Sequence, residues 1–266
     1  MLKYIFIIPY RDRLHHKYFF EKYMEHILED YEKDSYEIVF SHQKNNLPFN
    51  RGGMKNLGFL YIKNKYPEKY KDLIFIFNDI DTVPYKKNII KYDTSHGKIK
   101  HFYGYKFALG GIFSITGQDF EKINGFPNLW GWGFEDNEIN KRALNNNIIV
   151  DRTNFFNIDD MSILHFYDSY VKKISKSEAN NYKNNMLKDD GLDKIKSVTQ
   201  IFNTLTNMLD NIYFEGLFKP NNDTFSHNIK NGPKLRIPTN NVIMNIDKSS
   251  KNKKKNNTYF DFIPSS

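Results

Sequence analysis

Short apolar runs alternate with longer amphipathic segments in the first third of the chain. The runs at 4–8, 36–40 and 73–77 are continuous and rich in aromatic and β-branched residues, which is typical of strands buried on both faces. Between them, residues 14–28 and 54–66 space their apolar positions as a helix does. The order strand, helix, strand, helix, strand predicts an α/β fold with a mostly parallel central sheet and right-handed crossovers.

The second half of the chain is less regular. Its pattern predicts a strand at 107–115 that carries a Gly-Gly pair, and a loop rich in Gly, Trp and Pro at 126–135. Helices are predicted at 135–144 and 177–187. The first of these begins with acidic residues, which suits the positive end of a helix dipole.

The composition changes near residue 221, where the chain becomes polar and rich in Asn. We therefore expect one α/β domain over 1–220 and a polar C-terminal extension over 221–266. The extension contains a candidate strand at 241–246 and a charged low-complexity run at 247–258, which is typical of a solvated segment.

Hydrophobic residues make up 39% of the 266 residues and aromatic residues 16%, which is enough for a sizeable core. The formal net charge is +8, but part of it lies in the tail at 251–255, and no nucleic-acid-binding motif accompanies it. We therefore expect no nucleic-acid partner. A basic chain is compatible with a diphosphate substrate.

The chain contains no cysteine, which excludes disulfides and thiolate metal sites. A reducing compartment such as the cytoplasm is the simplest interpretation. The apolar run at the N-terminus is too short for a membrane span and continues into charged residues. We therefore expect a soluble protein without a membrane span, and its oligomeric state stays open.

Two aspartates follow the third buried run. Asp79 and Asp81 are two positions apart, so their side chains point to the same side if the backbone stays extended. Ligands of open α/β sheets bind beyond the carboxyl ends of the strands, and carboxylates suit Mg²⁺ or Mn²⁺. The alternative is a solvated pair in a turn. His165 could add a nitrogen ligand, although a lone histidine among aromatic residues is more often structural.

Both tryptophans of the chain lie between glycines in the segment 126–136, which ends in Glu135 and Asp136. Glycine lets the backbone approach a ligand closely, and a tryptophan face packs well against the C–H face of a sugar. An acid at a helix start could accept the proton of an attacking hydroxyl group. A tight turn with a core tryptophan would explain either tryptophan alone, whereas the whole cluster favours a site.

Basic residues follow the first strand and precede the second helix. Arg11 and Arg13 could bind phosphate groups in a bidentate manner, and the loop with Arg51 could hold a phosphate or a nucleoside at a helix start. The alternatives are a salt bridge of Arg13 at a helix start and ordinary helix capping by Asn50.

Together, these segments resemble the β-1,4-galactosyltransferase family, and they occur in the same order along the chain. The resemblance covers residues 1 to about 195, and its block from Asn-Gly-Phe-Pro to Glu-Asp is highly specific. The matching segments are 7–13, 49–59, 77–84, 110–111, 123–136 and 186–192.

The resemblance implies a GT-A fold, an inverting mechanism, a UDP-sugar donor, and Mn²⁺ (or Mg²⁺) as the cofactor. The donor-binding residues that it implies are Pro9, Tyr10, Arg11, Arg13, Phe49, Arg51, Asp79, Gly111 and Trp132. It also implies that Asp81 and His165 bind the metal ion. Glu135 would hold the donor sugar, and Asp136 would be the general base.

The chain departs from the family pattern around the expected site. Ser162 occupies the position of a methionine metal ligand, with Met161 one residue earlier, so the resemblance does not supply a third protein ligand. Phe134 and Asn137 differ from the family pattern where the acceptor sugar would bind. The resemblance therefore does not imply that the acceptor is N-acetylglucosamine. Ala108 replaces an aromatic residue that crowds the donor's C2 substituent, so an N-acetylhexosamine could be admitted. The chain has no cysteine for the family's disulfides, and we expect no membrane anchor of the kind that the family has.

We therefore expect a metal-dependent inverting glycosyltransferase. It would move galactose or an N-acetylhexosamine from a UDP-sugar to a hydroxyl group of a carbohydrate acceptor and form a β-linkage. The segment 168–177 is expected to close over the donor. Two alternatives stay open, a non-catalytic carbohydrate-binding relative and a metal-dependent nucleotide-processing enzyme.

Overall fold

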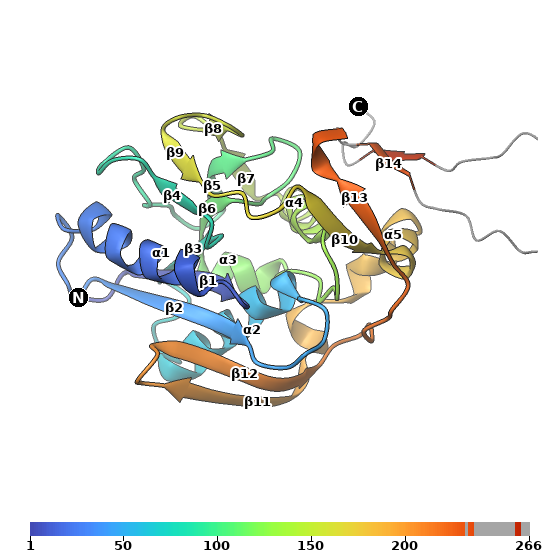
Figure 1. Cartoon of the computed structure of the whole chain (residues 1–266). Coiled ribbons are helices and arrows are strands. Elements are labelled where there is room, and N and C mark those ends of the chain that lie inside the picture. Colours follow the sequence, from blue (N-terminus) through green and yellow to red (C-terminus); the bar gives the residue numbers. More distant parts are fainter. Residues whose placement is uncertain (232–233, 237–258, 262–266) are drawn as a thin grey trace, which may run out of the picture.

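The computed structural model describes residues 1–231, 234–236 and 259–261, and its centre is one mixed β-sheet flanked by helices (Figure 1). The strands of this sheet are β1 (Tyr4–Tyr10), β2 (Tyr36–Gln43), β3 (Ile74–Asn78), β5 (Lys98–Gly104), β6 (Ile112–Thr116), β7 (Ile149–Asp151), β8 (Phe156–Asn157), β11 (Lys196–Asn203) and β12 (Met208–Glu215). Their order is β11-β12-β2-β1-β3-β6-β5-β7, with β8 beside β5.

Helices flank this sheet, and three small strand pairs lie outside it. The helices are α1 (Leu14–Ile27), α2 (Arg51–Lys65), α3 (Gly117–Lys122), α4 (Glu135–Asn145) and α5 (Lys176–Lys183), with short 3₁₀ turns at Met186–Asp189, Leu192–Lys194 and Ile229–Asn231. The strand pairs are β4 (Thr82–Pro84) with β9 (Ile163–His165), β10 (Val171–Ser175) with β13 (Thr224–Asn228), and β14 (Lys234–Arg236) with β15 (Tyr259–Asp261).

The parallel half of the sheet is built around β1. Strands β2 and β3 pair with β1 in parallel, and β12 pairs with β2 in parallel. Strand β6 is antiparallel to both β3 and β5, so the sheet is mixed. The predicted α/β fold with a mostly parallel central sheet is confirmed, as are the three predicted strands and two helices of the first third.

Alternate residues of β1 point to opposite faces of the sheet, as in any extended strand. Phe6 belongs to the core cluster that includes Phe20 of α1, and Ile7 belongs to the cluster that includes Phe59 of α2. Helix α2 approaches β1 closely at Gly58, because a Cβ atom there would lie 2.7 Å from a methyl carbon of Ile7. Both layers of helices are thus packed on a strand that is buried along its whole length.

Two predicted elements of the second half are shorter than expected. The strand predicted at 107–115 begins only at Ile112, because Gly111 adopts a positive φ of 69° and residues 107–111 turn toward a cavity. The helix predicted at 177–187 ends at Lys183, since Asn185 has a φ of 57° and breaks the helical path. The helix predicted at 135–144 is confirmed as α4.

Residues after 195 complete the fold in ways that the hydrophobic pattern did not predict. The hairpin of β11 and β12 extends the sheet beyond β2. Residues 224–228, which fall in the expected C-terminal extension, form β13 and pair with β10, so the folded unit continues past residue 220. The candidate strand at 241–246 lies outside the described residues. Among the helices that the structure describes, none is both long and apolar enough for a bilayer crossing.

Asn56 of α2 forms hydrogen bonds with the beginning of the segment 126–136, which contains both tryptophans. Its amide donates to the carbonyl oxygen of Phe126 (2.7 Å) and to Asn128 (3.0 Å), and its oxygen accepts from the Phe126 N–H (2.9 Å). The side chain is fully buried. We predict that Asn56→Ala lowers the free energy of unfolding by about 3 kcal/mol, because it leaves buried backbone groups without partners.

Urea unfolding followed by circular dichroism measures this loss. Asn64→Ala, on the exposed side of the same helix, is the control and should change stability by less than about 0.5 kcal/mol. Equal stability of the two variants would show that Asn56 does not hold the loop.

Candidate active site

A cavity of about 480 Å³ lies beyond the carboxyl end of β3, a size typical of small-ligand sites. Eight of the residues predicted from the sequence line it together: Arg51, Asp79, Asp81, Gly111, Trp132, Glu135, Asp136 and His165. They come from segments far apart in the chain, so the fold, rather than any local motif, assembles them.

Charged residues of the cavity wall lie at the ends of secondary-structure elements. Asp79 directly follows β3, and Arg51 is the first residue of α2. Asn50 caps this helix, since its side chain accepts a hydrogen bond from the Gly53 N–H (2.7 Å), which confirms the capping interpretation of Asn50. Glu135 opens α4, whose first turn therefore brings acidic side chains to the cavity.

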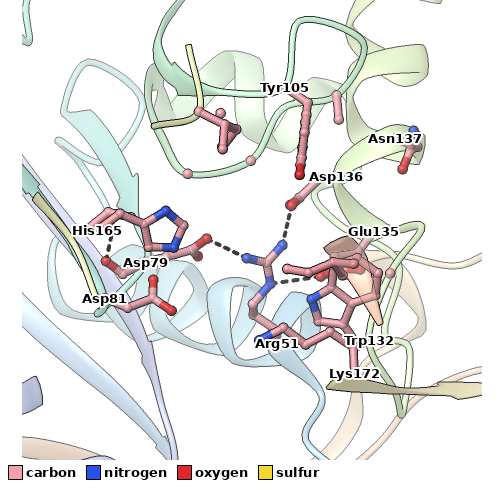
Figure 2. Close-up of a pocket in the computed structure, with 18 of the residues that line it drawn as sticks. Arg51, Asp79, Asp81, Tyr105, Trp132, Glu135, Asp136, Asn137, His165 and Lys172 are labelled. Carbon is pink, nitrogen blue, oxygen red and sulfur yellow. Dashed lines mark hydrogen bonds and ion pairs between the residues drawn. The ribbon is translucent and has the colours of Figure 1, made fainter. Parts of the chain in front are cut away.

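The Arg51 guanidinium group lies between three carboxylates (Figure 2). Its nitrogens contact Asp79 at 2.5 Å and Glu135 at 2.7 Å, and a third contact reaches Asp136. Figure 2 shows Asp79, Asp81 and His165 on one side of Arg51, and Asp136 and Asn137 on the other. Arg51 thus joins the aspartate side of the cavity to the acids of α4.

Lys55 adds a second cation to this cluster. It lies four residues after Arg51, so both project from the same face of α2. Its ammonium group is fully buried, 3.3 Å from Asp79 and 3.7 Å from Asp136, and lies over the ring of Phe126. Two cations therefore face three carboxylates in a largely desolvated cluster.

The two aspartates of this cluster have pKa values shifted in opposite directions. Burial would raise the pKa of Asp79, but Arg51 and Lys55 outweigh it and lower the pKa to about 2. Burial raises the pKa of Asp136 to about 6; Arg51 and Lys55 oppose the rise, and Glu135 adds to it. Asp79 is therefore a permanent anion, whereas Asp136 exchanges a proton near neutral pH, as a general base does.

The two predicted metal ligands lie at the aspartate side. His165, in β9, pairs in register with Thr82, the residue after Asp81. The Tyr103 hydroxyl group is 2.8 Å from Nδ1 of His165 and fixes the ring, which leaves Nε2 for a ligand. Burial lowers the pKa of His165, against the opposing effect of Asp81, so the imidazole is neutral at pH 7, as a metal ligand must be.

A third protein ligand is missing near Asp81 and His165. Within the described ranges, no group of three His, Cys, Asp or Glu side chains is arranged to hold a metal ion. Neither Met161 nor Ser162 lines the cavity. Mg²⁺ and Mn²⁺ sites often have one or two protein ligands and take the rest from substrate phosphates, so these residues fit a metal ion that arrives with a diphosphate.

Arg13 lies behind the cavity wall rather than in its lining. Its guanidinium group bridges Asp81 and Asp168, at 2.8 Å from each. Arg13 therefore orients the predicted metal ligand and ties it to the segment after His165. Arg13 precedes the first residue of α1, so these are salt bridges at a helix start, as the alternative interpretation of Arg13 expected, with partners that are distant in the sequence.

The two tryptophans have different roles. Trp130 is buried, stacks on Phe214 with ring centroids 5.1 Å apart, and donates to the Phe218 carbonyl group, so it belongs to the core. Trp132 lines the cavity, and its backbone N–H donates to the Lys173 carbonyl group of β10 (2.9 Å). Only Trp132 is placed to contact a ligand.

Close contacts shape the cavity around Asp136. Phe134, at the start of α4, has a positive φ of 73°, a conformation that favours glycine, and its buried ring stacks on Tyr182. Gly110 abuts Asp136, because a Cβ atom there would lie 2.3 Å from the carboxylate. A side chain at residue 110 would therefore displace the predicted base.

Besides Arg13, four predicted donor-binding residues lie outside the lining of the cavity. Pro9 and Tyr10 end β1, where Tyr10 is buried against His42. Arg11 donates to the Leu47 carbonyl group, and Phe49 packs near Trp130. Their role in binding a nucleotide stays a prediction.

Several lining residues were not predicted from the sequence. They are Thr82, Tyr103, Gly104, Tyr105, Phe107, Ile158, Tyr167, Lys172, His227 and Ile229. The spacing of Arg51 and Lys55 could have indicated the buried lysine, since residues four apart share a helix face. No comparable signal marks His227, because it reaches the cavity only through the pairing of β13 with β10.

Two family models match the chain. The model described as the N-terminal region of glycosyl transferase group 7 matches residues 1–93, and the model described as the N-terminal domain of galactosyltransferase matches residues 92–168. Together they span most of the site, including Arg51, Asp136 and His165.

Curated relatives of this chain are galactosyltransferases. A Caenorhabditis elegans xylosylprotein 4-beta-galactosyltransferase is 28% identical over 187 residues, which are 67% of this chain and 63% of the relative. Mus musculus beta-1,4-galactosyltransferase 1 is 31% identical over 157 residues, 56% of this chain and 38% of the relative. The chain thus spans only part of the length of these relatives.

Solved structures share the fold. The catalytic domain of Drosophila beta-1,4-galactosyltransferase 7, in complex with xylobiose, superposes with a TM-score of 0.58 at 19% identity, and covers 83% of this chain and 96% of that chain. A mutant of the same protein, in complex with manganese, UDP-Gal and xylobiose, gives a TM-score of 0.60 at 20% identity. The GT-A fold expected for this chain is confirmed.

We predict that Arg51→Met lowers the free energy of unfolding by about 3–5 kcal/mol at pH 7.5, because it leaves buried carboxylates without their cation. The loss should shrink toward pH 4. The lowered pKa of Asp79 contributes stability that is present above its unfolded pKa and disappears as pH falls toward 2. Without Arg51, the carboxylates take up protons at higher pH. Urea unfolding at several pH values measures both effects.

Lys63→Met is the control for Arg51→Met. It removes a partly exposed ion pair with Glu121 and should cost at most about 1 kcal/mol at any pH. A loss at Arg51 that is as small as this, or that does not vary with pH, would contradict the buried cluster as described.

Proposed function

The chain belongs to the β-1,4-galactosyltransferase family, and from this premise we propose that it transfers galactose or an N-acetylhexosamine from a UDP-sugar to a carbohydrate hydroxyl group, with inversion at the anomeric carbon. One observation carries the proposal: a single cavity contains the candidate metal ligands Asp81 and His165 together with Asp136. An inverting transfer needs these two functions on opposite sides of one reacting carbon.

Asp136 is proposed as the base. Its raised pKa of about 6 makes it a competent proton acceptor at neutral pH, and its carboxylate faces the cavity from the first turn of α4. Leu109 donates its backbone N–H to the Asp136 carbonyl group (2.8 Å), which fixes the start of the helix. Asp136 would accept the proton of the acceptor hydroxyl group as its oxygen attacks C1.

Asp81 and His165 are proposed to hold Mn²⁺ or Mg²⁺ together with the donor diphosphate. A bound ion of this kind neutralises charge on the departing diphosphate. Tyr103 and Arg13 orient the two side chains, through contacts of 2.8 Å each. Preorganised positions of this type need no rearrangement when charge develops on the leaving group.

Aromatic side chains would exclude water and hold the sugars. Tyr105, Phe107, Trp132, Phe134 and Tyr167 line the cavity, and such side chains offer flat apolar faces. A dry site strengthens the electrostatic interactions within it and limits hydrolysis of the donor.

Ala108 lines the cavity together with Gly110 and Gly111, and its methyl group is smaller than the aromatic side chain of the family pattern. This supports including an N-acetylhexosamine among the proposed donors.

Phe134 and Asn137 stand near Asp136, so the acceptor side differs from the family pattern. The solved relative binds xylobiose, and a carbohydrate acceptor is proposed for this chain by similarity. The expected reducing compartment stays a prediction.

The contacts of Asp79 weigh against a nucleotide-processing enzyme that would use Asp79 and Asp81 as a metal-binding pair. Both oxygens of Asp79 face cations, Arg51 and Lys55, rather than open space. The raised pKa of Asp136 weighs against a non-catalytic binding protein, since ligand binding alone gives no reason for such a residue.

We predict that Asp136→Asn lowers kcat by about 10²–10⁴-fold, the usual contribution of a general base. The donor is first identified by screening UDP-galactose, UDP-glucose, UDP-N-acetylglucosamine and UDP-N-acetylgalactosamine for Mn²⁺-dependent turnover. The kcat/KM of the wild type should fall as pH decreases through about 6, because protonated Asp136 cannot accept a proton. The variant should lack this acid limb.

Asp72→Asn is a matched control, since Asp72 is exposed and remote from the cavity. It should retain wild-type turnover and the same pH profile. Near-wild-type turnover of Asp136→Asn would remove Asp136 as the base, and no turnover of any UDP-sugar by the wild type would count against the proposed function itself.

A further inference from the structure

Strands β10 and β13 form a small antiparallel sheet beside the cavity, beyond residue 168, where the family models end (Figure 1). In the register of this pair, Lys172 is opposite His227, and Lys173 is opposite Ser226. Neighbouring residues of a strand point to opposite faces, so these two cross-strand pairs lie on different sides of the small sheet.

One face of the small sheet points inward. Lys172 and His227 both line the cavity, and the next inward residue, Ile174, is buried in a cluster that also contacts Trp132. The other face points to solvent, where the Lys173 ammonium group donates to the Ser226 hydroxyl group (2.9 Å). Two consecutive lysines therefore have opposite environments.

Contacts at both edges fix the position of β10. On one edge, the Trp132 N–H donates to the Lys173 carbonyl group (2.9 Å). On the other edge, β13 supplies the strand pairing, and Asp223 accepts from the Ser175 hydroxyl group (2.8 Å) and the Ser177 N–H (2.7 Å). Strand β13 and Asp223, which directly precedes it, thus help to hold Lys172 at the cavity.

Lys172 lies close to the candidate metal ligands. Its nearest acidic partner is Asp168, at 4.0 Å, and Asp168 is bound more closely by Arg13, at 2.8 Å. Arg13 in turn contacts Asp81 at 2.8 Å. In the described part of the chain, the Lys172 ammonium group makes no hydrogen bond, so it retains capacity for an anion.

We propose that Lys172 binds the diphosphate of the donor and that β13 positions it to do so. The inference rests on the proposed function, because it requires a nucleotide diphosphate in this cavity. Lys172 adds a cation near Asp81, where the charge of a departing diphosphate would otherwise face only Arg51 and the metal ion. An ammonium group serves this purpose as a point charge with three donors.

An acidic group on the acceptor is the competing ligand for Lys172. Figure 2 draws Lys172 on the same side of the view as Trp132, and Tyr105, Asp136 and Asn137 on the opposite side, and Lys172 is linked to Asp81 through Asp168 and Arg13. Because Asp136 marks the position of the attacking hydroxyl group, the location of Lys172 favours the donor.

Lys172→Met and Lys173→Met form a matched pair that separates this role from general effects of charge. UDP and uridine are titrated into each variant and into the wild type by calorimetry in the presence of Mn²⁺. Lys172→Met should weaken UDP binding by about tenfold, as expected for loss of one charge-assisted hydrogen bond, and leave uridine binding unchanged. Lys173→Met should bind both ligands like the wild type, and Lys172→Arg should retain most of the UDP affinity.

Each result has a distinct meaning. Equal UDP affinity of Lys172→Met and the wild type overturns the inference and leaves the proposed function intact. A raised acceptor KM with unchanged UDP affinity would assign Lys172 to the acceptor and also overturn it. Failure of the wild type to bind UDP would overturn the proposed function, and this inference with it. If Lys172→Met unfolds, the Lys172→Arg and Lys172→Gln variants provide the same comparison.

Discussion

The site depends on one buried electrostatic interaction, the contact of Arg51 with Asp79, Glu135 and Asp136. Without this guanidinium group, the carboxylates that follow β3 and open α4 would repel one another in a cavity with little water. Lys55 adds a second buried cation. Because Arg51 and Lys55 stand on the first turns of α2, and α2 packs on β1, the central sheet fixes where the charges meet.

The same cluster separates two chemical tasks. Cations dominate around Asp79 and keep it ionised, whereas burial dominates at Asp136 and raises its pKa to about 6. Asp81 and His165, held by Arg13 and Tyr103, stand apart from the base. A reaction that needs charge neutralisation at one end and proton transfer at the other is therefore matched by two groups of contacts that line one cavity. Strand β13 supports the first of these groups, since it pairs with the strand that carries Lys172.

Features that depend on a few neighbouring residues were predictable from the sequence. The buried runs of β1, β2 and β3 and the acids of the segment 126–136 were recognisable because strand periodicity and helix-start chemistry act over a few residues. The division of roles between Trp130 and Trp132 was not predictable, because only packing against Phe214 marks one of them as core. His227 was missed for a related reason: its place depends on a pairing of strands about fifty residues apart in the chain.

Direct binding of Mn²⁺ tests the central claim, that one cavity joins a metal-bound diphosphate to a base. Electron paramagnetic resonance detects free Mn²⁺ during titration of the protein with and without UDP. With two candidate protein ligands, the account predicts weak binding alone and roughly tenfold or tighter binding of one ion with UDP, and this gain should be lost in His165→Ala. Tight Mn²⁺ binding without UDP, or the same gain in His165→Ala, would contradict it.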